Sequence, residues 1–203
     1  MFEKKNIPSI RFAGFTDAWE QRKLSEYLDV SNEKNTEDVF TKQDVIDCAD
    51  NVLTEEIIKE LHFILKRDTK DSTLDWFAVG DYKKRPNVVG GRETTKPKDV
   101  PARMKALLDA YNVKGEVTIQ DIIAFHAAFE QIHPFQDGNG RVGRLVALKE
   151  CLRFNIGPFL IEDSKKAFYY RGLSEWDNEK GWLTDTCLDG QDTFKRLLKM
   201  FEL

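Results

Sequence analysis

The sequence has few cysteines and no long apolar run, and each absence excludes a class of protein. Its 203 residues include three widely spaced cysteines, Cys48, Cys151 and Cys187, and no CxxC pair. This number and spacing suggest neither a disulfide framework nor a zinc site, and they favour reduced thiols in a cytosol. No segment approaches the roughly 18 apolar residues of a membrane span, and residues 1–12 lack the apolar core of a signal peptide. We therefore expect a soluble, intracellular protein without a membrane anchor.

An excess of positive charge is also missing. Lys and Arg number 31 against 35 Asp and Glu, which gives a formal net charge of −4. A broad, non-specific nucleic-acid surface needs concentrated positive charge, so nucleic acid is not an expected partner. Because 41% of the residues are hydrophobic in a chain of this length, we expect one main domain with one sizeable core.

Helical periodicity dominates the chain after residue 52. Apolar spacing predicts helices at residues 53–67, 99–112, 118–132, 144–155, 164–179 and 183–201. Thr54 is expected to cap the first of these helices and Thr118 the third. In the first helix, Ile57, Leu61 and Ile64 are expected to face the core. The predicted fold class is therefore all-α.

One segment departs from this pattern. Residues 76–91 place aromatic and β-branched residues between glycines and are interrupted by Pro86. Proline cannot donate to a sheet ladder, so this composition predicts a short hairpin or extended flap with an exposed edge. Residues 1–50 are more polar, and 31–44 are typical of a linker. The expected organisation is an N-terminal segment, residues 1–50, and one helical domain, residues 51–203.

The stretch HPFQDGNGRVGR, residues 133–144, breaks several rules of helix formation at once. Its three glycines each cost a helix about 1 kcal/mol relative to alanine. Arg141 and Arg144 fall in the first turns of the following helix, where the dipole disfavours cations. A bound anion resolves these conflicts, because bare helix-start amides cradle phosphate oxygens and two arginines on one face chelate others. The stretch therefore predicts a polyphosphate site.

Two further residues of the stretch suggest chemistry. Asp137 stands at the mouth of the predicted cradle, and Mg²⁺ beside phosphates is usually held by one or two carboxylates. His133 has an imidazole whose unperturbed pKa, near 6.5, suits a general base at neutral pH. Phe135, between them, is expected to be an apolar anchor for the loop.

Plainer interpretations compete with these. The glycines could simply connect two helices, and His126, Glu130 and His133 share a helix face that imitates a metal site. No second carboxylate–histidine pair supports a tight transition-metal site. His126 and His62 are each expected to be structural, hydrogen-bonded histidines. The core is expected to include three tryptophans, Trp76, Trp176 and Trp182.

The stretch resembles the signature of the Fic family, HxFx(D/E)GNGRxxR. Its fixed positions are matched by His133, Phe135, Asp137, Gly138, Asn139, Gly140, Arg141 and Arg144. The resemblance extends over about residues 50–203, because the segments FHAAFEQI and GDYKKRPNVVGG and the later helices look like one branch of the family. It implies a Fic-type helical bundle with a short β-hairpin flap. It also implies transfer of AMP from ATP to a hydroxyl side chain of a protein, with release of pyrophosphate.

The resemblance further implies a role for each residue. His133 deprotonates the attacking hydroxyl, Asp137 holds Mg²⁺ (or Mn²⁺) against the phosphates, and Phe135 is structural. The ATP phosphates are bound by an anion hole and an arginine clamp, Gly138, Asn139, Gly140, Arg141 and Arg144. The flap that aligns a target segment by strand addition comprises Asp81, Tyr82, Lys83, Lys84, Arg85, Pro86, Asn87, Val88, Val89, Gly90 and Gly91.

Restraint of the activity is a separate question. Many Fic proteins carry an inhibitory helix, (S/T)xxxE(G/N), whose glutamate pairs with the second motif arginine, here Arg144. No segment satisfies the whole pattern, and the nearest, TDAWEQ, has Glu20 without the following Gly or Asn. It lies within residues 10–28, and about the first 45 residues resemble a type I restriction specificity subunit. The expected protein is a fusion located in a bacterial cytoplasm. It is expected to be active without removal of any segment, unless a separate antitoxin or self-association restrains it.

Three functions are open from the sequence. The leading one is a Mg²⁺-dependent protein adenylyltransferase that acts on an unidentified target protein or on its own chain. A sister activity on the same scaffold, such as phosphoryl transfer or transfer of another nucleotide, is the first alternative. The second is an inactive interaction module that docks on a restriction–modification complex. The intact Arg144 favours ordinary placement of ATP.

Overall fold

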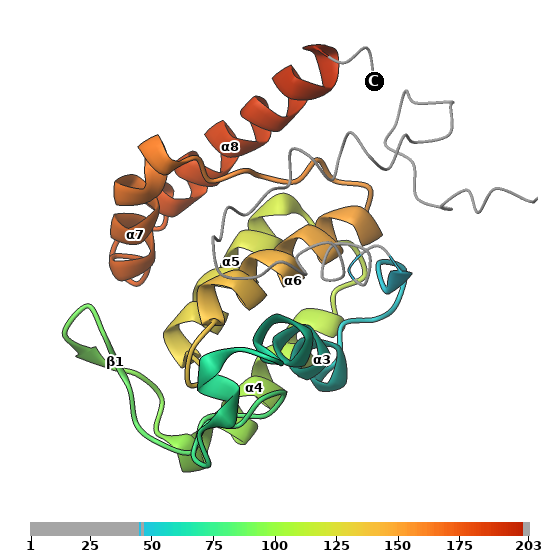
Figure 1. Ribbon diagram of the computed structural model, residues 1–203. Coiled ribbons are helices and arrows are strands. Elements are labelled where there is room, and N and C mark those ends of the chain that lie inside the picture. Colours follow the sequence, from blue (N-terminus) through green and yellow to red (C-terminus); the bar gives the residue numbers. More distant parts are fainter. Residues whose placement is uncertain (1–44, 46, 201–203) are drawn as a thin grey trace, which may run out of the picture.

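The computed structural model describes residues 45 and 47–200, which fold into a helical bundle with one small hairpin (Figure 1). The longer helices are α3 (Glu55–Lys66), α4 (Val100–Asn112), α5 (Ile119–Ile132), α6 (Asn139–Arg153), α7 (Lys166–Ser174) and α8 (Gly181–Met200). The short 3₁₀ turns are η1 (Lys70–Thr73), η2 (Pro97–Asp99) and η3 (Asp163–Lys165). The strands β1 (Val88–Val89) and β2 (Arg92–Glu93) pair antiparallel. The predicted class, all-α with a short hairpin, is confirmed.

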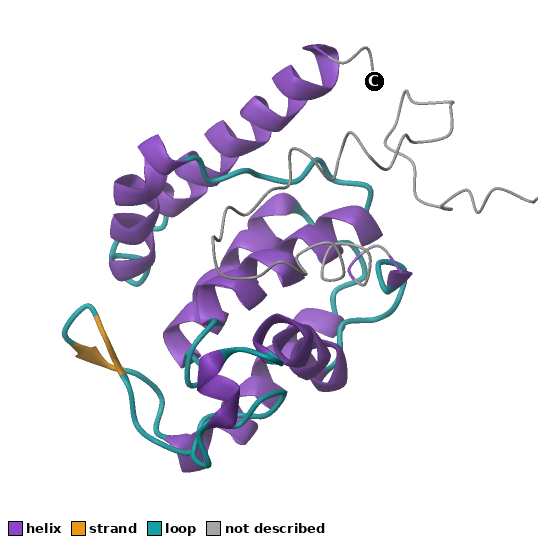
Figure 2. Ribbon diagram, in the orientation of Figure 1, coloured by secondary structure: helices purple, strands orange, loops and turns teal. Residues whose placement is uncertain are grey.

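Helices α5 and α6 form the centre of the bundle (Figure 1). On one side, α3 packs against α6 and α4 packs against α5. On the other side, α7 and α8 pack against each other and against α5. The hairpin projects from this body (Figure 2). No helix in the described part of the chain is long and apolar enough to cross a bilayer.

The first described helix, α3, begins as its sequence predicts but turns a different face inward. Thr54 caps it, because its hydroxyl accepts the Ile57 N–H at 3.3 Å. Buried side chains of α3 include His62 and Lys66, whereas Ile57 and the predicted core residue Ile64 are only partly buried. Leu61 is buried as predicted and Ile57 packs against the core, but apolar spacing could not reveal that the inner face also carries a histidine and a lysine.

The ends of α5 and α6 define a connecting loop of residues 133–138, the motif loop. Thr118 and Asp121 form the expected capping box at the start of α5. The helix ends at His133, which is left-handed with φ 52°. Helix α6 begins directly after Gly138, also left-handed with φ 83°, and thus several residues before the predicted start at residue 144. Much of the signature is therefore the first turns of α6 itself.

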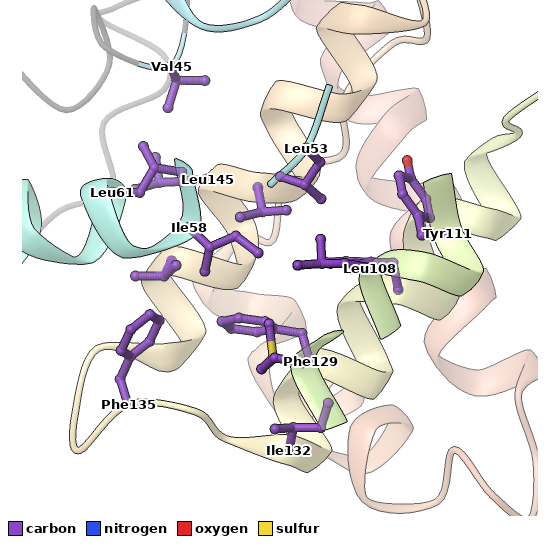
Figure 3. Close-up of a cluster of buried hydrophobic side chains, with 14 of the residues drawn as sticks. Val45, Leu53, Ile58, Leu61, Leu108, Tyr111, Phe129, Ile132, Phe135 and Leu145 are labelled. Atoms are coloured by element: carbon purple, nitrogen blue, oxygen red, sulfur yellow. The ribbon is translucent and has the colours of Figure 1, made fainter. Parts of the chain in front are cut away.

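The main core lies between α3, α4, α5 and α6 (Figure 3). Phe129 and Ile132 enter it from α5, and Phe135 enters it from the motif loop. A second cluster joins α5 to α7 and α8 through Ile123 and Tyr169, among others. Because α6 is packed against both α3 and α5, most of its side chains are buried, and the start of this helix is held rigidly.

Two features differ from expectation. The hairpin strands occupy residues 88–93, so the regular pairing is shorter and later than the predicted segment 76–91. Trp182 is exposed on α8 beneath the Arg171 guanidinium, at 3.4 Å, whereas Trp176 is buried as expected. Most of the N-terminal segment, residues 1–44 and 46 with Glu20, lies outside the described residues.

Candidate active site

The motif loop is closed by the side chain of Asn139. Its Oδ1 accepts the Phe135 N–H at 2.8 Å, and its Nδ2 donates to the Phe135 carbonyl at 2.9 Å. The side chain is buried by these contacts. Asn139 therefore offers its backbone N–H at the helix start to an anion, while its side chain closes the loop.

Helix α3 fixes the loop from the other side through His62. The His62 ring stacks on Phe135 with centroids 4.0 Å apart and planes within 3°. Its Nδ1 accepts the Gly80 N–H at 3.0 Å, so its Nε2 carries the proton and donates to the Asp137 carbonyl at 3.2 Å. Burial lowers the pKa of His62 to about 4, which keeps this neutral tautomer at physiological pH. His62 is a structural histidine, as expected, and the structure that it stabilises is the motif loop of the site.

Lys66 orients the Asp137 carboxylate. Its Nζ lies 2.7 Å from Asp137 Oδ2 and 3.1 Å from an oxygen of Asp71, while the lysine itself is only 3% exposed. Arg141 also approaches Asp137 Oδ2, at 3.4 Å. The Asp137 carboxyl is partly buried, but Lys66, the Gly138 amide and Arg141 hold its pKa below the usual value. The carboxylate is therefore charged and fixed in direction.

His133 lies at the end of α5 with its Nδ1 buried and without a hydrogen-bond partner in the described structure. Burial, and then the charge of Lys83, lower its pKa to about 4. This pKa lies below the unperturbed value near 6.5 that the sequence alone could supply. At neutral pH the imidazole is unprotonated and free to accept a proton.

The segment before the hairpin is attached to the motif loop. Lys83 N–H donates to the Pro134 carbonyl at 2.9 Å, and Asn87 Nδ2 donates to the Phe135 carbonyl at 3.2 Å. Lys83 is 2% exposed, and its ammonium donates to the side chains of Asn87 and Thr94, which flank the hairpin. Burial lowers the pKa of Lys83 to about 8. Lys83 thus joins the base of the hairpin to the site.

These contacts correct the extent of the predicted flap. Tyr82 and Lys83 are buried and so cannot pair with a target segment. Asn87 is engaged with the loop, whereas Val88, at 62% exposure, and Val89 present apolar side chains to solvent. Of the predicted flap, residues 84–86 and 88–91 are exposed, and residues 88–91 form the first strand and the turn of the hairpin. Residues 88–91 are therefore the best candidates for strand addition.

The three glycines of the motif lie in three different surroundings. Gly138 needs its left-handed conformation, at φ 83°. At Gly140 a Cβ would lie in ordinary contact with Arg144 Nη1, at 3.4 Å, so this guanidinium packs directly over the glycine. At Gly143 a Cβ would lie 2.7 Å from Glu130 Oε1 and 2.9 Å from the His126 ring. Gly143 therefore serves close packing of α6 on α5, which corrects the view that an anion explains all three.

The start of α6 is consequently an anion site of defined composition. The amides of Asn139 and Gly140 belong to the first turn, which has no intrahelical acceptor for them. Arg141 and Arg144 are both half-buried, and Arg144 curls back over Gly140. Asp137 is the acidic group at this position, and a single carboxylate beside phosphates suits Mg²⁺, which retains most of its waters. No three His, Cys, Asp or Glu side chains form a metal-binding group within the described part of the chain.

Fold and site together define an all-α domain in which a central helix begins at an anion site with an unprotonated histidine beside it. Residues 52–151 match the sequence model of the Fic/DOC family, so this part of the chain is a Fic/DOC family domain. The match ends before α7 and α8, so the second core cluster lies partly outside it.

The chain is also similar to individual relatives. It is 38% identical over 68 residues to a probable protein adenylyltransferase of Aquifex aeolicus, which covers 32% of this chain and 21% of that protein. It resembles a Fic domain-containing signalling protein of Bacteroides thetaiotaomicron at 27% identity and a TM-score of 0.62, covering 79% of this chain and 66% of the other. The BepC protein of Bartonella tribocorum, solved with bound AMPPNP, shares the fold at 16% identity and a TM-score of 0.54, covering 91% and 96%. No comparison supports the restriction-subunit resemblance of the N-terminus.

Sequence reasoning missed the two positioning groups on α3. His62 and Lys66 are one turn apart and both face the motif loop, but a lone histidine and a terminal lysine on a helix carry no distinctive signal. Their spacing of four residues places both side chains on one face of α3, and this was the only indication in the sequence that a polar face of the helix contacts the site.

The histidines also predict an acid dependence of stability. His62, His126 and His133 all have pKa values lowered to about 4, so below pH 6.5 the unfolded chain binds protons that the folded chain does not. Glu130, whose pKa is raised to about 7 by burial, acts in the opposite direction and offsets one of them. The free energy of unfolding should therefore fall as the pH falls from 6.5 toward 4.

Urea unfolding of wild type and His62→Gln tests this dependence. Between pH 6 and pH 5 the variant should lose about 1 kcal/mol less than wild type, because it lacks one titrating group. Equal losses in the two proteins would show that His62 is not held unprotonated by the fold.

Proposed function

We propose that this protein transfers the AMP moiety of ATP to a hydroxyl group of a protein. The observation that carries the proposal is the unprotonated His133 imidazole at one edge of an anion site that also contains Arg141 and Arg144. The name of the Aquifex relative and the AMPPNP bound by the Bartonella neighbour support the same chemistry. The chain spans about a fifth of the length of that relative, so activity, target and partners are all part of the proposal.

The proposed reaction is an in-line displacement at the α-phosphorus. The target hydroxyl oxygen attacks the phosphorus while His133 accepts the hydroxyl proton. The bond from the α-phosphorus to the oxygen that bridges to the β-phosphate breaks, and pyrophosphate leaves. The amides at the start of α6 and the two guanidinium groups stabilise the negative charge that develops. The products are an AMP ester on the target and pyrophosphate.

The donor set also fits Mg²⁺. Asp137 would hold the ion, since its carboxylate is charged and is already oriented by Lys66. When bound, the ion would neutralise phosphate charge and polarise the phosphoryl oxygens. Lys66 keeps the carboxylate in place, and Arg141, which now contacts Asp137, has phosphate oxygens as its natural partners once a nucleotide enters.

The target is proposed to be a protein segment that lies along the exposed edge at residues 88–91. That edge offers backbone groups beside the attachment of the hairpin to the motif loop, and backbone pairing demands little of the target sequence. Self-modification, and restraint by an antitoxin or by self-association, are further proposals on the same basis.

Labelled nucleotides test the proposal. Bacterial lysate or the purified chain is incubated with ATP labelled at the α-phosphate or, separately, at the γ-phosphate, with Mg²⁺ and with a chelator. We expect protein-bound label from the α-phosphate alone, and none with the chelator. Label from the γ-phosphate alone would indicate phosphoryl transfer instead, and absence of ATP binding by calorimetry would indicate an inactive module.

A further inference from the structure

A buried lysine joins the two ends of the hairpin. The Lys83 ammonium donates to Asn87 Oδ1 at 2.8 Å and to Thr94 Oγ1 at 2.6 Å. Asn87 directly precedes β1 and Thr94 directly follows β2, and the Thr94 N–H also donates to the Asn87 carbonyl at 3.3 Å. We call Lys83, Asn87 and Thr94 the hairpin clamp.

Stability alone does not account for a lysine at this position. Both acceptors of its ammonium are neutral oxygens, and burying a cation against neutral groups is costly. Apolar side chains of similar volume often replace buried charges without loss of stability. A role in geometry is the better explanation, because the clamp controls where the hairpin lies.

The hairpin needs such a support. Its two strands form two residue pairs, and all four strand residues are exposed. A two-stranded hairpin of this kind is at best marginally stable in water. Arg92 on β2 reaches Ser174 and Glu175 at the end of α7, but this arginine is exposed and such contacts contribute little.

The clamp is attached to the two residues that follow His133. The Lys83 N–H donates to the Pro134 carbonyl, and the Asn87 amide group donates to the Phe135 carbonyl. Phe135 is fully buried in the main core, so the base of the hairpin is fixed relative to the imidazole.

The pairing pattern shows which backbone groups the clamp presents. Asn87 and Thr94 form a hydrogen-bonded pair, and Val88 faces Glu93 at the next position of the ladder. Because hydrogen-bonded and non-hydrogen-bonded pairs alternate, the N–H and carbonyl of Val88 point away from β2. They are the groups with which an added strand would pair, directly beside the clamp.

We infer that Lys83 is a positioning residue for the target, whose ammonium fixes the hairpin so that Val88 meets an extended target segment at a set distance from His133. The inference rests on the proposed function, because it takes the target to be a protein segment paired with this edge. A preformed edge spares the entropy of ordering the hairpin when the target binds. The phosphate ligands on α6 are not part of the clamp, so ATP binding should not depend on it.

The test compares Lys83→Met with wild type in the full chain. The variant keeps the length of the side chain and removes both hydrogen bonds of the ammonium. Transfer of label from α-labelled ATP to lysate proteins, at lysate concentrations below saturation, should slow about tenfold, since hydrogen bonds to a charged group contribute on this order. The rate at saturating lysate should fall much less, and the Kd for ATP should be unchanged. Hydrogen exchange at the amides that pair within the hairpin should become about tenfold faster.

Threonine variants provide matched controls. Thr94→Val removes an acceptor of the clamp and should repeat the effect of Lys83→Met, whereas Thr94→Ser keeps the hydroxyl and should restore transfer. Thr95→Val should leave transfer unchanged, because the buried Thr95 hydroxyl has no hydrogen-bond partner in the described structure.

Three results would overturn the inference: wild-type transfer by Lys83→Met, an equal loss with Thr95→Val, or a parallel rise in the Kd for ATP. The last would show that Lys83 supports the anion site and not the target edge. Absence of label with wild type would instead refute the proposed function, and hydrogen exchange would still show whether Lys83 holds the hairpin.

Discussion

Replacing His133 by alanine should reduce the rate of AMP transfer by about 100- to 10,000-fold, the range typical of a lost general base. The imidazole is unprotonated because burial and Lys83 lower its pKa to about 4, and no other histidine of the described chain can replace it. His62 donates into the motif loop, and His126 is bonded to Tyr169. The rate is measured as label transferred from α-labelled ATP at saturating nucleotide.

Binding and folding provide the control for this variant. His133→Ala should bind ATP with nearly the affinity of wild type, because the phosphate ligands on α6 are untouched. Transfer at more than a tenth of the wild-type rate would contradict the assignment of His133 as the base. A large loss of ATP affinity would show that its role is in binding.

The second large effect is on stability and concerns a buried ion pair at the far end of α6. Lys149 and Glu150 are almost fully buried, with Lys149 Nζ 2.6 Å from Glu150 Oε1. The lysine also bonds to the carbonyl of Asn51, just before α3. Lys149→Met keeps the side-chain volume and removes the nearer cationic partner of the buried Glu150, which then keeps only Arg153 at 3.6 Å. The loss should cost about 3 kcal/mol in the free energy of unfolding.

Urea denaturation at pH 7 measures this cost. The matched control is Lys105→Met, which removes a lysine from an exposed pair with Asp109 four residues along α4. The control should change the stability by less than about 0.5 kcal/mol. Similar small effects for both variants would show that the Lys149 pair contributes no more than a surface pair.

The fold was largely accessible from the sequence because its determinants are local. Capping at Thr54 and Thr118 and the apolar periodicity of the later segments specify the helices one at a time. Periodicity failed for the inner face of α3, where His62 and Lys66 are buried. It failed because polar residues are assigned to the surface unless their partners are known, and here the partners are on the motif loop.

The candidate site could be located from the sequence but not built from it. The glycines and arginines of the motif indicated an anion at a helix start, since both are unfavourable there without one. What spacing could not show is that Gly143 serves helix packing and that the Asn139 side chain closes the loop. The lowered pKa of His133 was also hidden, because it depends on burial and on Lys83, which is fifty residues away in the chain.

The central claim is that AMP is joined to a hydroxyl by the action of the histidine at the start of the motif loop. Peptide mass spectrometry after incubation with ATP and Mg²⁺, in wild type and in His133→Ala, tests it most directly. The account predicts serine, threonine or tyrosine residues that carry AMP with wild type and are unmodified with the variant. Modified residues that carry phosphate alone, or AMP adducts that persist with His133→Ala, would contradict it.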